Sequence, residues 1–533
     1  MPSRTTLRLL APTLLVGLSL LSLPEPAVAQ VPAAPAEPAA QTSPAAQPDL
    51  AAIDRFITQA RADWAVPGLA VAIVKDGRTV FAKGYGVRAA GSSEPVDEHT
   101  LFAIASNTKA FTSAALATLV DEGKLSWDDR VRDHLPYFLV YDRGVSEEMR
   151  IRDLLSHRSG LGTYSGDVLW WGAPLSAEEV VRRAQYLPQA GAFRASYNYS
   201  NLMFIAAGEV VAAASGRSWA QYVRDEILQP VGMQRTVLTI DSLAARDNVA
   251  SPHKVIDGRN TPIPWHGWNA MGAAGSIISS VSDMSQWLQL QLRGGLLPDG
   301  DTLFSPTQQW TMWTVHTPLA VPPSMRTLYP STHFRGYGLG WSLNDYEGRR
   351  LVSHGGAYDG MYSRVLLVPE EGLGMVVLTN SMTGISNAIT NHIVDLYLGA
   401  EPRDWSGILR EREEAGNRRE AQRRADFVRV TLPNTKPALP LASYAGTYTG
   451  PMLDVSVTLE NGGLVLRLPH GELVADLRHR QLETFLIDWR REWAWFEDGV
   501  ATFVLDEAGK VVELKLNVPN QDIFFEELVL KRE

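Results

Sequence analysis

Two groups of strand patterns, far apart in the sequence, enclose a long region with helical patterns. The first group, residues 68–87, has two β-rich runs around Asp76-Gly77, a dipeptide typical of a tight hairpin turn. Helical patterns then dominate residues 100–292, and strand patterns return between residues 336 and 380. Strands on both sides of a helical region predict one antiparallel sheet that is flanked by helices and interrupted by an inserted helical lobe. The predicted fold class of this part, residues 49–400, is therefore α/β (α+β).

The pattern changes after this region. Residues 401–440 mix arginines with acidic residues and predict a charged helical linker. In residues 441–533 apolar and polar residues alternate in several short runs, as in Val455, Val457 and Leu459. This period of two predicts a separate all-β domain, either a sandwich or a barrel.

The N-terminal residues have the pattern of an export signal. A basic start and a short apolar run precede a small-residue cleavage site that ends at Ala29. This pattern predicts a signal peptide over residues 1–29, cut after Ala29, and a secreted or periplasmic protein with no stable membrane span after cleavage. A retained N-terminal anchor is the alternative. Residues 30–48 are rich in Ala and Pro and predict a disordered tether.

Composition excludes several classes of site. There is no cysteine in the 533 residues, which excludes disulfides, thiolate nucleophiles and thiolate metal ligands. No His-Glu-x-x-His or comparable spacing occurs, so we predict no metal and no cofactor. The net charge of −10 provides no electrostatic reason for binding nucleic acid or an anionic membrane.

The sequence contains two Ser-x-x-Lys matches, and their surroundings differ. Pro252 and the nearby Asp257-Gly258 turn place the match that begins at Ser251 in a loop. Ser106, in contrast, precedes a run that is apolar on most faces of a helix. A helix that is apolar nearly all round is buried, so we expect its first turn to be held rigidly.

Ser106 and Lys109 lie three residues apart at the start of that helix. This spacing brings the two side chains to one face, with Cβ atoms about 5–6 Å apart. Free N–H groups and the positive dipole end of the helix favour negative charge there. A buried lysine loses its proton more easily and then activates an alcohol as a nucleophile. From these residues alone, a capping serine followed by a solvent-facing lysine is the alternative.

Two further stretches strengthen the catalytic interpretation. Tyr199 and Asn201 stand immediately before an apolar helix, which Asn201 is well placed to cap. His354 follows a strand pattern and is itself followed by Gly355 and Gly356. Glycines at such a place let a ligand lie close against the backbone.

Ser-x-x-Lys, Tyr-x-Asn and a His-x-Gly strand, in this order, resemble the serine β-lactamase-related hydrolases. This family includes class C β-lactamases, D-alanyl-D-alanine carboxypeptidases, D-aminopeptidases and related esterases. The resemblance covers residues 49–400 and extends to the runs "VPGLAVAIVKDG", "LLSHRSGL", "PVGM", "MGAAGSIISSVSDMSQWL" and "YGLGW". It implies the β-lactamase/penicillin-binding fold and a serine hydrolase that works through an acyl-enzyme.

Carried over residue by residue, the resemblance implies five catalytic side chains. Ser106 would attack the scissile carbonyl and hold the acyl group. Lys109 and Tyr199 would share the proton transfers, and which of them is the base is disputed within the family. Asn201 would orient the lysine and bind the substrate amide. His354 takes the place of a lysine of class C β-lactamases, near the polar end of the substrate.

The resemblance also implies an oxyanion hole and a class of substrate. The backbone N–H groups of Ser106 and Ala357 would bind the oxyanion, with Gly355 and Gly356 beside the substrate. Because histidine is only partly charged at neutral pH, His354 puts strong binding of a β-lactam carboxylate in doubt. We therefore expect a peptidase or amidase that acts on small or D-amino-acid-containing peptides. A carboxylesterase or weak β-lactamase, and a slowly acylating penicillin-binding or sensing protein, are the alternatives.

Other features have more than one interpretation. His157 is more simply explained as fixing a turn than as a catalytic group. "YAGTYTG", at the start of the last domain, resembles the lipocalin-like barrel appended to some family members, which implies gating, assembly, ligand binding or stability alone. A homo-oligomer is also left open. Four loop tryptophans either roof the cleft or pack in the core: Trp170, Trp171, Trp265 and Trp268.

Overall fold

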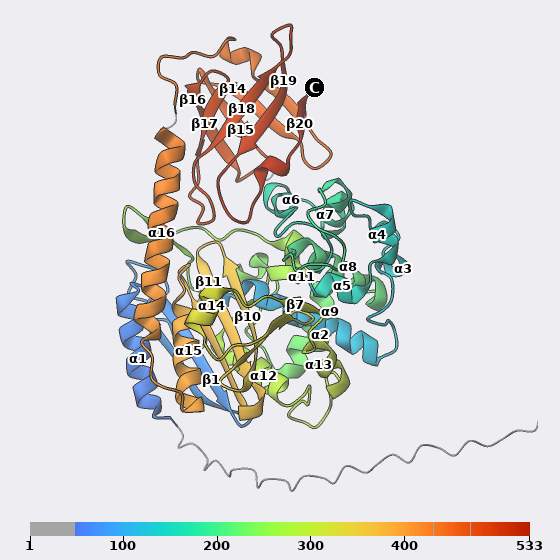
Figure 1. The fold of residues 1–533 in the computed structure, drawn as a ribbon, viewed down its shortest axis with the longest axis vertical. Coiled ribbons are helices and arrows are strands. Elements are labelled where there is room, and N and C mark those ends of the chain that lie inside the picture. The colour runs from blue at the N-terminus through green and yellow to red at the C-terminus, as the bar shows by residue number, and fades with distance from the viewer. Residues whose placement is uncertain (1–47, 430, 470) are drawn as a thin grey trace, which may run out of the picture. The chain divides into compact units, whose positions relative to one another are not determined.

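The computed structural model describes residues 48–429, 431–469 and 471–533, which belong to one compact unit (Figure 1). The predicted signal peptide, residues 1–29, and residues 30–47 of the predicted tether lie outside the described residues. The first described element is helix α1 (Leu50–Asp63), which Asp49 caps by accepting a hydrogen bond from the N–H of Ala51.

An antiparallel sheet of eight strands forms the centre of the larger domain. The N-terminal hairpin turns at Asp76-Gly77, as its sequence predicts, and then pairs with the last strand of the sheet, with Leu69 opposite Thr379. The two strand groups therefore form one sheet. Across the sheet the strands are β2 (Arg78–Gly86), β1 (Gly68–Lys75), β12 (Leu373–Thr379), β11 (Met361–Val368), β10 (Arg349–Tyr358), β9 (Ser342–Tyr346), β8 (Arg335–Tyr337) and β7 (Thr317–Leu319).

Helices cover both faces of this sheet. On one face α1 packs beside α15 (Ile385–Leu398), as Figure 1 shows. On the other face lie α12 (Val281–Leu292) and α2 (Thr108–Asp121). Side chains of a strand alternate between the two faces of the sheet. Val71 therefore belongs to the hydrophobic core that includes α1 and α15, and Ala70 belongs to the core that includes α2 and α12. Burial on both faces explains why β1 is apolar up to Val74, before Lys75 at its end.

The inserted lobe holds most of the remaining helices. Its central helix, α8 (Asn201–Ser215), is buried along most of its length. The lobe also contains two small antiparallel pairs: β3 (Phe102–Ala103) with β6 (Ile278–Ser279), and the hairpin of β4 (His253–Ile256) with β5 (Arg259–Pro262). The other helices are α3 (Val131–His134), α4 (Arg143–Glu148), α5 (Ile151–Leu155), α6 (Asp167–Gly172), α7 (Ala177–Arg183), α9 (Trp219–Tyr222), α10 (Gln229–Val231), α11 (Gly272–Gly275), α13 (Pro306–Met312) and α14 (Pro323–Leu328).

The C-terminal part is a closed barrel rather than a sandwich. Its first and last strands pair, with Tyr448 opposite Arg532, so no strand edge is left open. Helix α16 (Trp405–Arg429) precedes it. No helix in the described part of the chain is both long and apolar enough to cross a membrane. The strands are β13 (Gly446–Thr449), β14 (Val455–Glu460), β15 (Gly463–Arg467), β16 (Val474–Gln481), β17 (Thr484–Trp489), β18 (Gly499–Leu505), β19 (Val511–Asn517) and β20 (Leu530–Arg532).

Candidate active site

Ser106 lies in a short 3-10 turn, Ala105–Asn107, that joins β3 to α2. The helix itself begins at Thr108, two residues later than the serine. Ala105 has a φ of 47°, in the left-handed region that non-glycine residues rarely adopt. Asn107 Nδ2 holds the turn by donating to Ser363 Oγ of β11 at 2.8 Å. The serine is therefore presented on a strained, fixed turn, which is common at functional sites.

The amine of Lys109 has three polar neighbours. Its Nζ lies 2.7 Å from the Oδ1 of Asn201, 2.9 Å from the carbonyl oxygen of Ala274 and 3.0 Å from the Oγ of Ser106. The amide and carbonyl oxygens can only accept, so each takes one N–H of the amine. In the neutral amine the remaining position is a lone pair directed at the Ser106 hydroxyl.

The environment of Lys109 favours this neutral form. The side chain is completely buried, and burial lowers its pKa to about 7, against an opposing attraction from Asp167. An unpaired ammonium in a low-dielectric interior is costly, because it loses its hydration. Near neutral pH a large fraction of Lys109 is therefore unprotonated and able to take the proton of Ser106.

Asn201 is the first residue of α8 rather than its cap. The cap is Ser200, whose Oγ accepts from the N–H of Met203 at 3.3 Å. The Asn201 Nδ2 donates to Asp167 at 2.6 Å, which turns Oδ1 toward Lys109. Asp167, buried at the start of α6, is missing from the predicted site.

Asp167 in turn accepts from the indole N–H of Trp170 at 3.0 Å. Burial raises the Asp167 pKa to about 8, and these two hydrogen bonds oppose the shift. In sequence Asp167 is only an acidic residue in the first turn of an apolar helix, a place that needs no function. Its position could not be recognised as part of the site without the fold.

Tyr199 and His157 pack against each other next to the serine and lysine. Burial raises the pKa of Tyr199 well above its ordinary value, although a hydrogen bond to Ser106 opposes this shift. His157 Nδ1 accepts from the N–H of Ser200 at 3.0 Å, and its ring lies 4.2 Å from that of Tyr199 between centroids. His157 therefore positions the Tyr199 segment from a turn, where its own φ is 56°.

His354 lies on β10 and is neutral. Burial lowers its pKa to about 3, and the charge of Lys109 acts in the same direction. Its Nδ1 lies 2.5 Å from the carbonyl oxygen of Gly355, so this nitrogen carries the proton, and Nε2 accepts from the hydroxyl of Tyr337 at 2.8 Å. The expectation of a partly charged histidine is replaced by an uncharged one, because the site removes it from water.

The strand that carries His354 has a free edge facing the cleft. The pairing of β9 with β10 ends at Ser342 opposite Ser353, so His354 and the residues after it have no partner on that side. A Cβ on Gly356 would meet the carbonyl oxygen of Ile104 at 2.1 Å, so only glycine permits this approach of β10 to the serine turn.

We expect Gly356→Ala to lower kcat/KM by about 10- to 100-fold, because β10 must move away from the serine turn by a fraction of an ångström or more. Steady-state kinetics on one ester and one anilide measures the loss. Gly471→Ala is the matched control, since nothing lies within 4 Å of the Cβ position there. An unchanged kcat/KM in Gly356→Ala would show that the close approach is not needed for catalysis.

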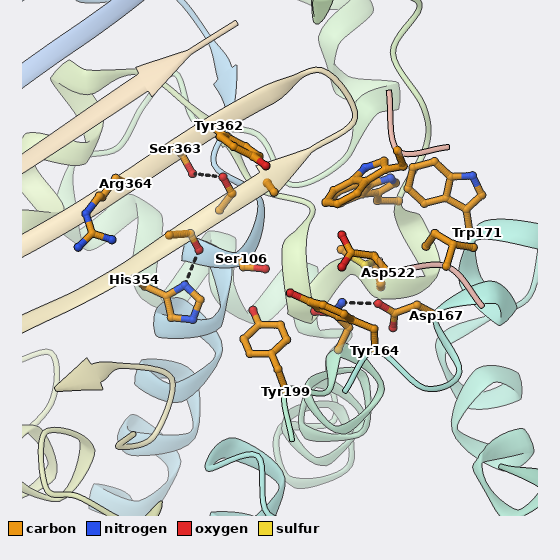
Figure 2. A pocket seen from close by; sticks show the side chains of 18 of the residues that line it. Ser106, Tyr164, Asp167, Trp171, Tyr199, His354, Tyr362, Ser363, Arg364 and Asp522 are labelled. Atoms are coloured by element: carbon orange, nitrogen blue, oxygen red, sulfur yellow. Dashed lines mark hydrogen bonds between the residues drawn. The ribbon is translucent and has the colours of Figure 1, made fainter. Parts of the chain in front are cut away.

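All the predicted site residues except Lys109, which is buried behind Ser106, line one cavity of about 300 Å³. Figure 2 shows Ser106 near its middle, with His354 on one side and Asp167 on the other. The second Ser-x-x-Lys match is not part of it, because Lys254 instead pairs with Glu492 at 2.7 Å. The cavity is lined by Ser106, Tyr199, Asn201, His354, Gly355, Gly356 and Ala357.

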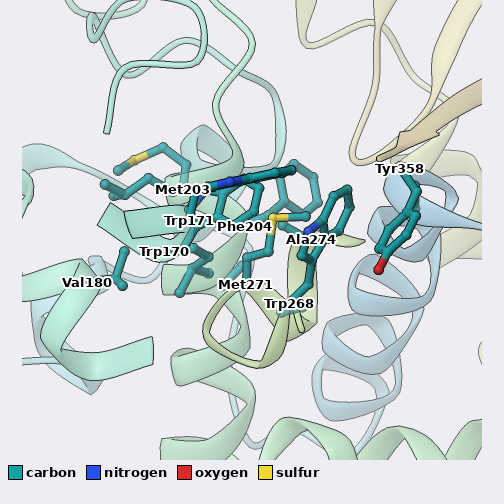
Figure 3. Packing of buried hydrophobic residues seen from close by; sticks show 14 of the residues in the cluster. Trp170, Trp171, Val180, Met203, Phe204, Trp268, Met271, Ala274 and Tyr358 are labelled. Atoms are coloured by element: carbon teal, nitrogen blue, oxygen red, sulfur yellow. The ribbon is translucent and has the colours of Figure 1, made fainter. Parts of the chain in front are cut away.

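The tryptophans have both of the predicted roles. Trp170, Trp171 and Trp268 are buried in the core and also line the cavity. Figure 3 shows them packed against Met271 and Phe204. Trp265 is only partly buried and does not line this cavity. The apolar wall of the site is therefore part of the lobe's core, which makes it rigid.

The barrel contributes residues to the same cavity. Glu527 of the barrel accepts from the N–H of Gly166 at 2.8 Å, and Asp359 accepts from the N–H of Ala494 in the barrel at 2.8 Å. Asp522, in the loop after β19, lines the cavity beside Asp167, as Figure 2 shows. Burial alone raises the Asp522 pKa to about 7.

Comparison with known proteins identifies the chain. A family model described as Beta-lactamase matches residues 53–399. The chain belongs to the Beta-lactamase family. A second family model, described as a domain of unknown function (DUF3471), matches residues 432–532 of this β-lactamase-family protein, the region that contains the barrel.

Relatives of this β-lactamase-family protein include named hydrolases. Unguisins hydrolase ungD' of Aspergillus campestris is 29% identical over 419 residues, covering 74% of this chain and 75% of the relative. Penicillin-binding protein 4 of Amycolatopsis lactamdurans is 29% identical over 343 residues, covering 63% of this chain and 85% of the relative. The family and these relatives support the assignment of serine hydrolase activity to the protein.

Solved structures share the fold of this β-lactamase-family protein. The octameric penicillin-binding protein homologue from Pyrococcus abyssi has a TM-score of 0.60 at 23% identity, covering 91% of this chain and 100% of that chain. SurE has a TM-score of 0.53 at 20% identity, covering 91% of this chain and 98% of that chain. The predicted fold class, a helix-flanked antiparallel sheet with a C-terminal barrel, is confirmed.

Proposed function

We propose that Ser106 forms an acyl-enzyme and that the protein is a peptidase or amidase. Its substrates would be small peptides, including peptides with D-residues, whose acyl residue carries a free amino group. The observation that carries this proposal is Asp522. Its carboxylate is largely buried in the cavity with Ser106 and has no hydrogen-bond or ion-pair partner among the described residues. An ammonium group of the substrate would supply that partner.

The proposed reaction begins when neutral Lys109 takes the proton of Ser106 as Oγ bonds to the substrate carbonyl carbon. The backbone N–H groups of Ser106 and Ala357 would bind the oxyanion. The C–N bond then breaks, and the amine leaves with a proton returned through Lys109 and the hydroxyl of Tyr199. Water hydrolyses the acyl ester by the same proton transfers and frees Ser106. His354, being neutral, takes part only by hydrogen bonding.

The names of two relatives agree with an amide substrate, since one is an unguisins hydrolase and one a penicillin-binding protein. Export by a signal peptide over residues 1–29 and assembly into a homo-oligomer remain proposals for this chain. The Pyrococcus abyssi homologue of the same fold is an octamer.

D-alanyl p-nitroanilide, its N-acetyl derivative and p-nitrophenyl acetate would test the proposal. We expect the free-amine anilide to be preferred over the acetylated one. We further expect Asp522→Asn to raise KM for the free amine by about 10- to 100-fold and to leave the ester unaffected. Glu507→Gln, which removes an exposed carboxylate from the same barrel, is the matched control.

Three results would contradict the proposal in different ways. Fast turnover of the ester with none of either anilide would indicate a carboxylesterase. Equal rates for the free and acetylated anilides would remove Asp522 from substrate binding. A stable penicillin adduct without product release would indicate a slowly acylating binding protein.

A further inference from the structure

Arg364 is a partly buried cation without a counterion among the described residues. It lies on β11 directly opposite Gly355. Its Nε has no hydrogen-bond partner, and the guanidinium forms no ion pair with any described residue. Figure 2 shows it on the His354 side of Ser106, away from Asp522. Burial lowers its pKa, and the only group that acts against this shift is the phenol of Tyr329.

The side chain is nevertheless reachable, because it lines two cavities. One is the cavity that contains Ser106, and the other has a volume of about 180 Å³. The second cavity lies between strands β8 to β11 and helices α14 and α15. A Cβ on Gly355 would meet nothing nearer than the carbonyl oxygen of Ser363 at 3.9 Å, so no side chain at this position narrows the approach from the first cavity to Arg364.

The second cavity is lined by two arginines, by neutral polar side chains such as Ser342, Asn344 and Asn391, and by apolar side chains. A second guanidinium, that of Arg335 on β8, also lines it and also has no side-chain partner among the described residues. No described acidic side chain lines the cavity. The apolar part of the wall includes Leu319, Leu366 and Val394.

The two guanidinium groups on this small cavity offer N–H donors that no described side chain accepts, and Arg364 also loses part of its hydration through burial. A carboxylate bridging them would restore hydrogen bonds, since a guanidinium binds carboxylate oxygens through two parallel N–H groups. The apolar wall would remove a hydrocarbon group of the same ligand from water. Both features therefore select one kind of molecule.

We propose that this second cavity binds a carboxylate ion that carries an apolar group, held by Arg364 and Arg335. This inference does not depend on the proposed peptidase function. The carboxylate comes either from the far end of a substrate, which passes Gly355 to reach Arg364, or from a free organic acid.

Isothermal titration calorimetry with 4-methylpentanoate tests the proposal, with 4-methylpentanamide as the uncharged counterpart. We expect the wild type to bind the acid and not the amide. Arg364→Gln and Arg335→Gln should each weaken binding of the acid by about 10- to 100-fold. Arg78→Gln removes an exposed, unpaired charge from the same sheet and should change nothing.

Failure to bind 4-methylpentanoate at millimolar concentration, or equal binding by Arg364→Gln and the wild type, would overturn the proposal. A folding defect does not confuse the test, because replacing an unpaired, partly buried charge with a neutral side chain is expected to maintain or raise Tm. In a thermal scan, 4-methylpentanoate should raise the Tm of the wild type only. The same shift in Arg364→Gln would also count against the site.

A second arm separates the two sources of the carboxylate. If the substrate supplies it, Arg364→Gln raises KM for peptides with a free C-terminal carboxylate but not for their C-terminal amides. If a free acid supplies it, both KM values stay unchanged while binding of 4-methylpentanoate is lost. Binding that survives in a protein with no hydrolase activity would leave this site standing while the proposed function fails.

Discussion

Replacing Ser106 with alanine is expected to lower kcat/KM by at least about 10⁴-fold, because the nucleophile has no substitute in the cavity. The effect should fall on kcat, since the rest of the binding surface is unchanged. Tm should stay close to that of the wild type, because the turn is held by backbone contacts and by Asn107 rather than by the serine hydroxyl. Hydrolysis of an activated ester and an anilide measures the first effect, and a thermal scan the second.

The chain offers its own control for this variant. Ser251→Ala alters the other Ser-x-x-Lys match, which lies outside the cavity, and should retain full activity. Intact mass spectrometry with a fluorophosphonate should show one adduct in the wild type and in Ser251→Ala, and none in Ser106→Ala. Retained turnover by Ser106→Ala, or an adduct on it, would disprove the acyl-enzyme mechanism. Penicillin in a parallel sample should give a transient adduct or none.

Replacing Lys109 with arginine is expected to lower kcat by about 10²- to 10⁴-fold, the range that a general base contributes. Arginine keeps the positive charge at any working pH and cannot accept the proton of Ser106. Lys515→Arg, at an exposed position on the barrel, is the matched control and should have no effect. Fluorophosphonate labelling should slow in Lys109→Arg in proportion to kcat, which separates loss of the base from loss of substrate binding.

The wild-type pH profile should report the same group. A base works only when deprotonated, and burial lowers the Lys109 pKa to about 7. The rate should therefore rise about tenfold per pH unit below this value and level off above it. Lys109→Arg should lose this rise. A rate that instead climbs only at strongly alkaline pH would assign the base to Tyr199, whose pKa burial raises.

Local patterns were sufficient for much of the fold. The hairpin at Asp76-Gly77 and the alternation in the last domain each depend on neighbouring residues, so each was predictable and each is present. Alternation by itself left a sandwich and a barrel open, because the choice depends on whether Tyr448 pairs with Arg532 at the two ends of the domain. The barrel was predicted from the family resemblance, and it is present. Alternation alone is the same in both architectures.

The candidate catalytic residues divide in the same way. Ser106 and Lys109 were predictable as a pair because one helical turn brings them together, and the distance between their side-chain atoms is 3.0 Å. The partners that set their chemistry come from elsewhere in the chain. Asp167, which orients Asn201, had no sequence signal of its own, and Tyr337, which holds His354, stood only in the run "YGLGW" with no role predicted for it.

The sequence by itself thus determined the helix-flanked sheet and the pairing of Ser106 with Lys109, because periodicity and short spacing act within a few residues. Only the tertiary structure decided the charge states of the site residues and which charged side chains lie at the two ends of the cleft. Burial of Lys109 and His354, and the unpaired charges of Asp522 and Arg364, arise from segments that meet only after folding. Desolvation depends on everything that surrounds a group, so no local pattern can encode it.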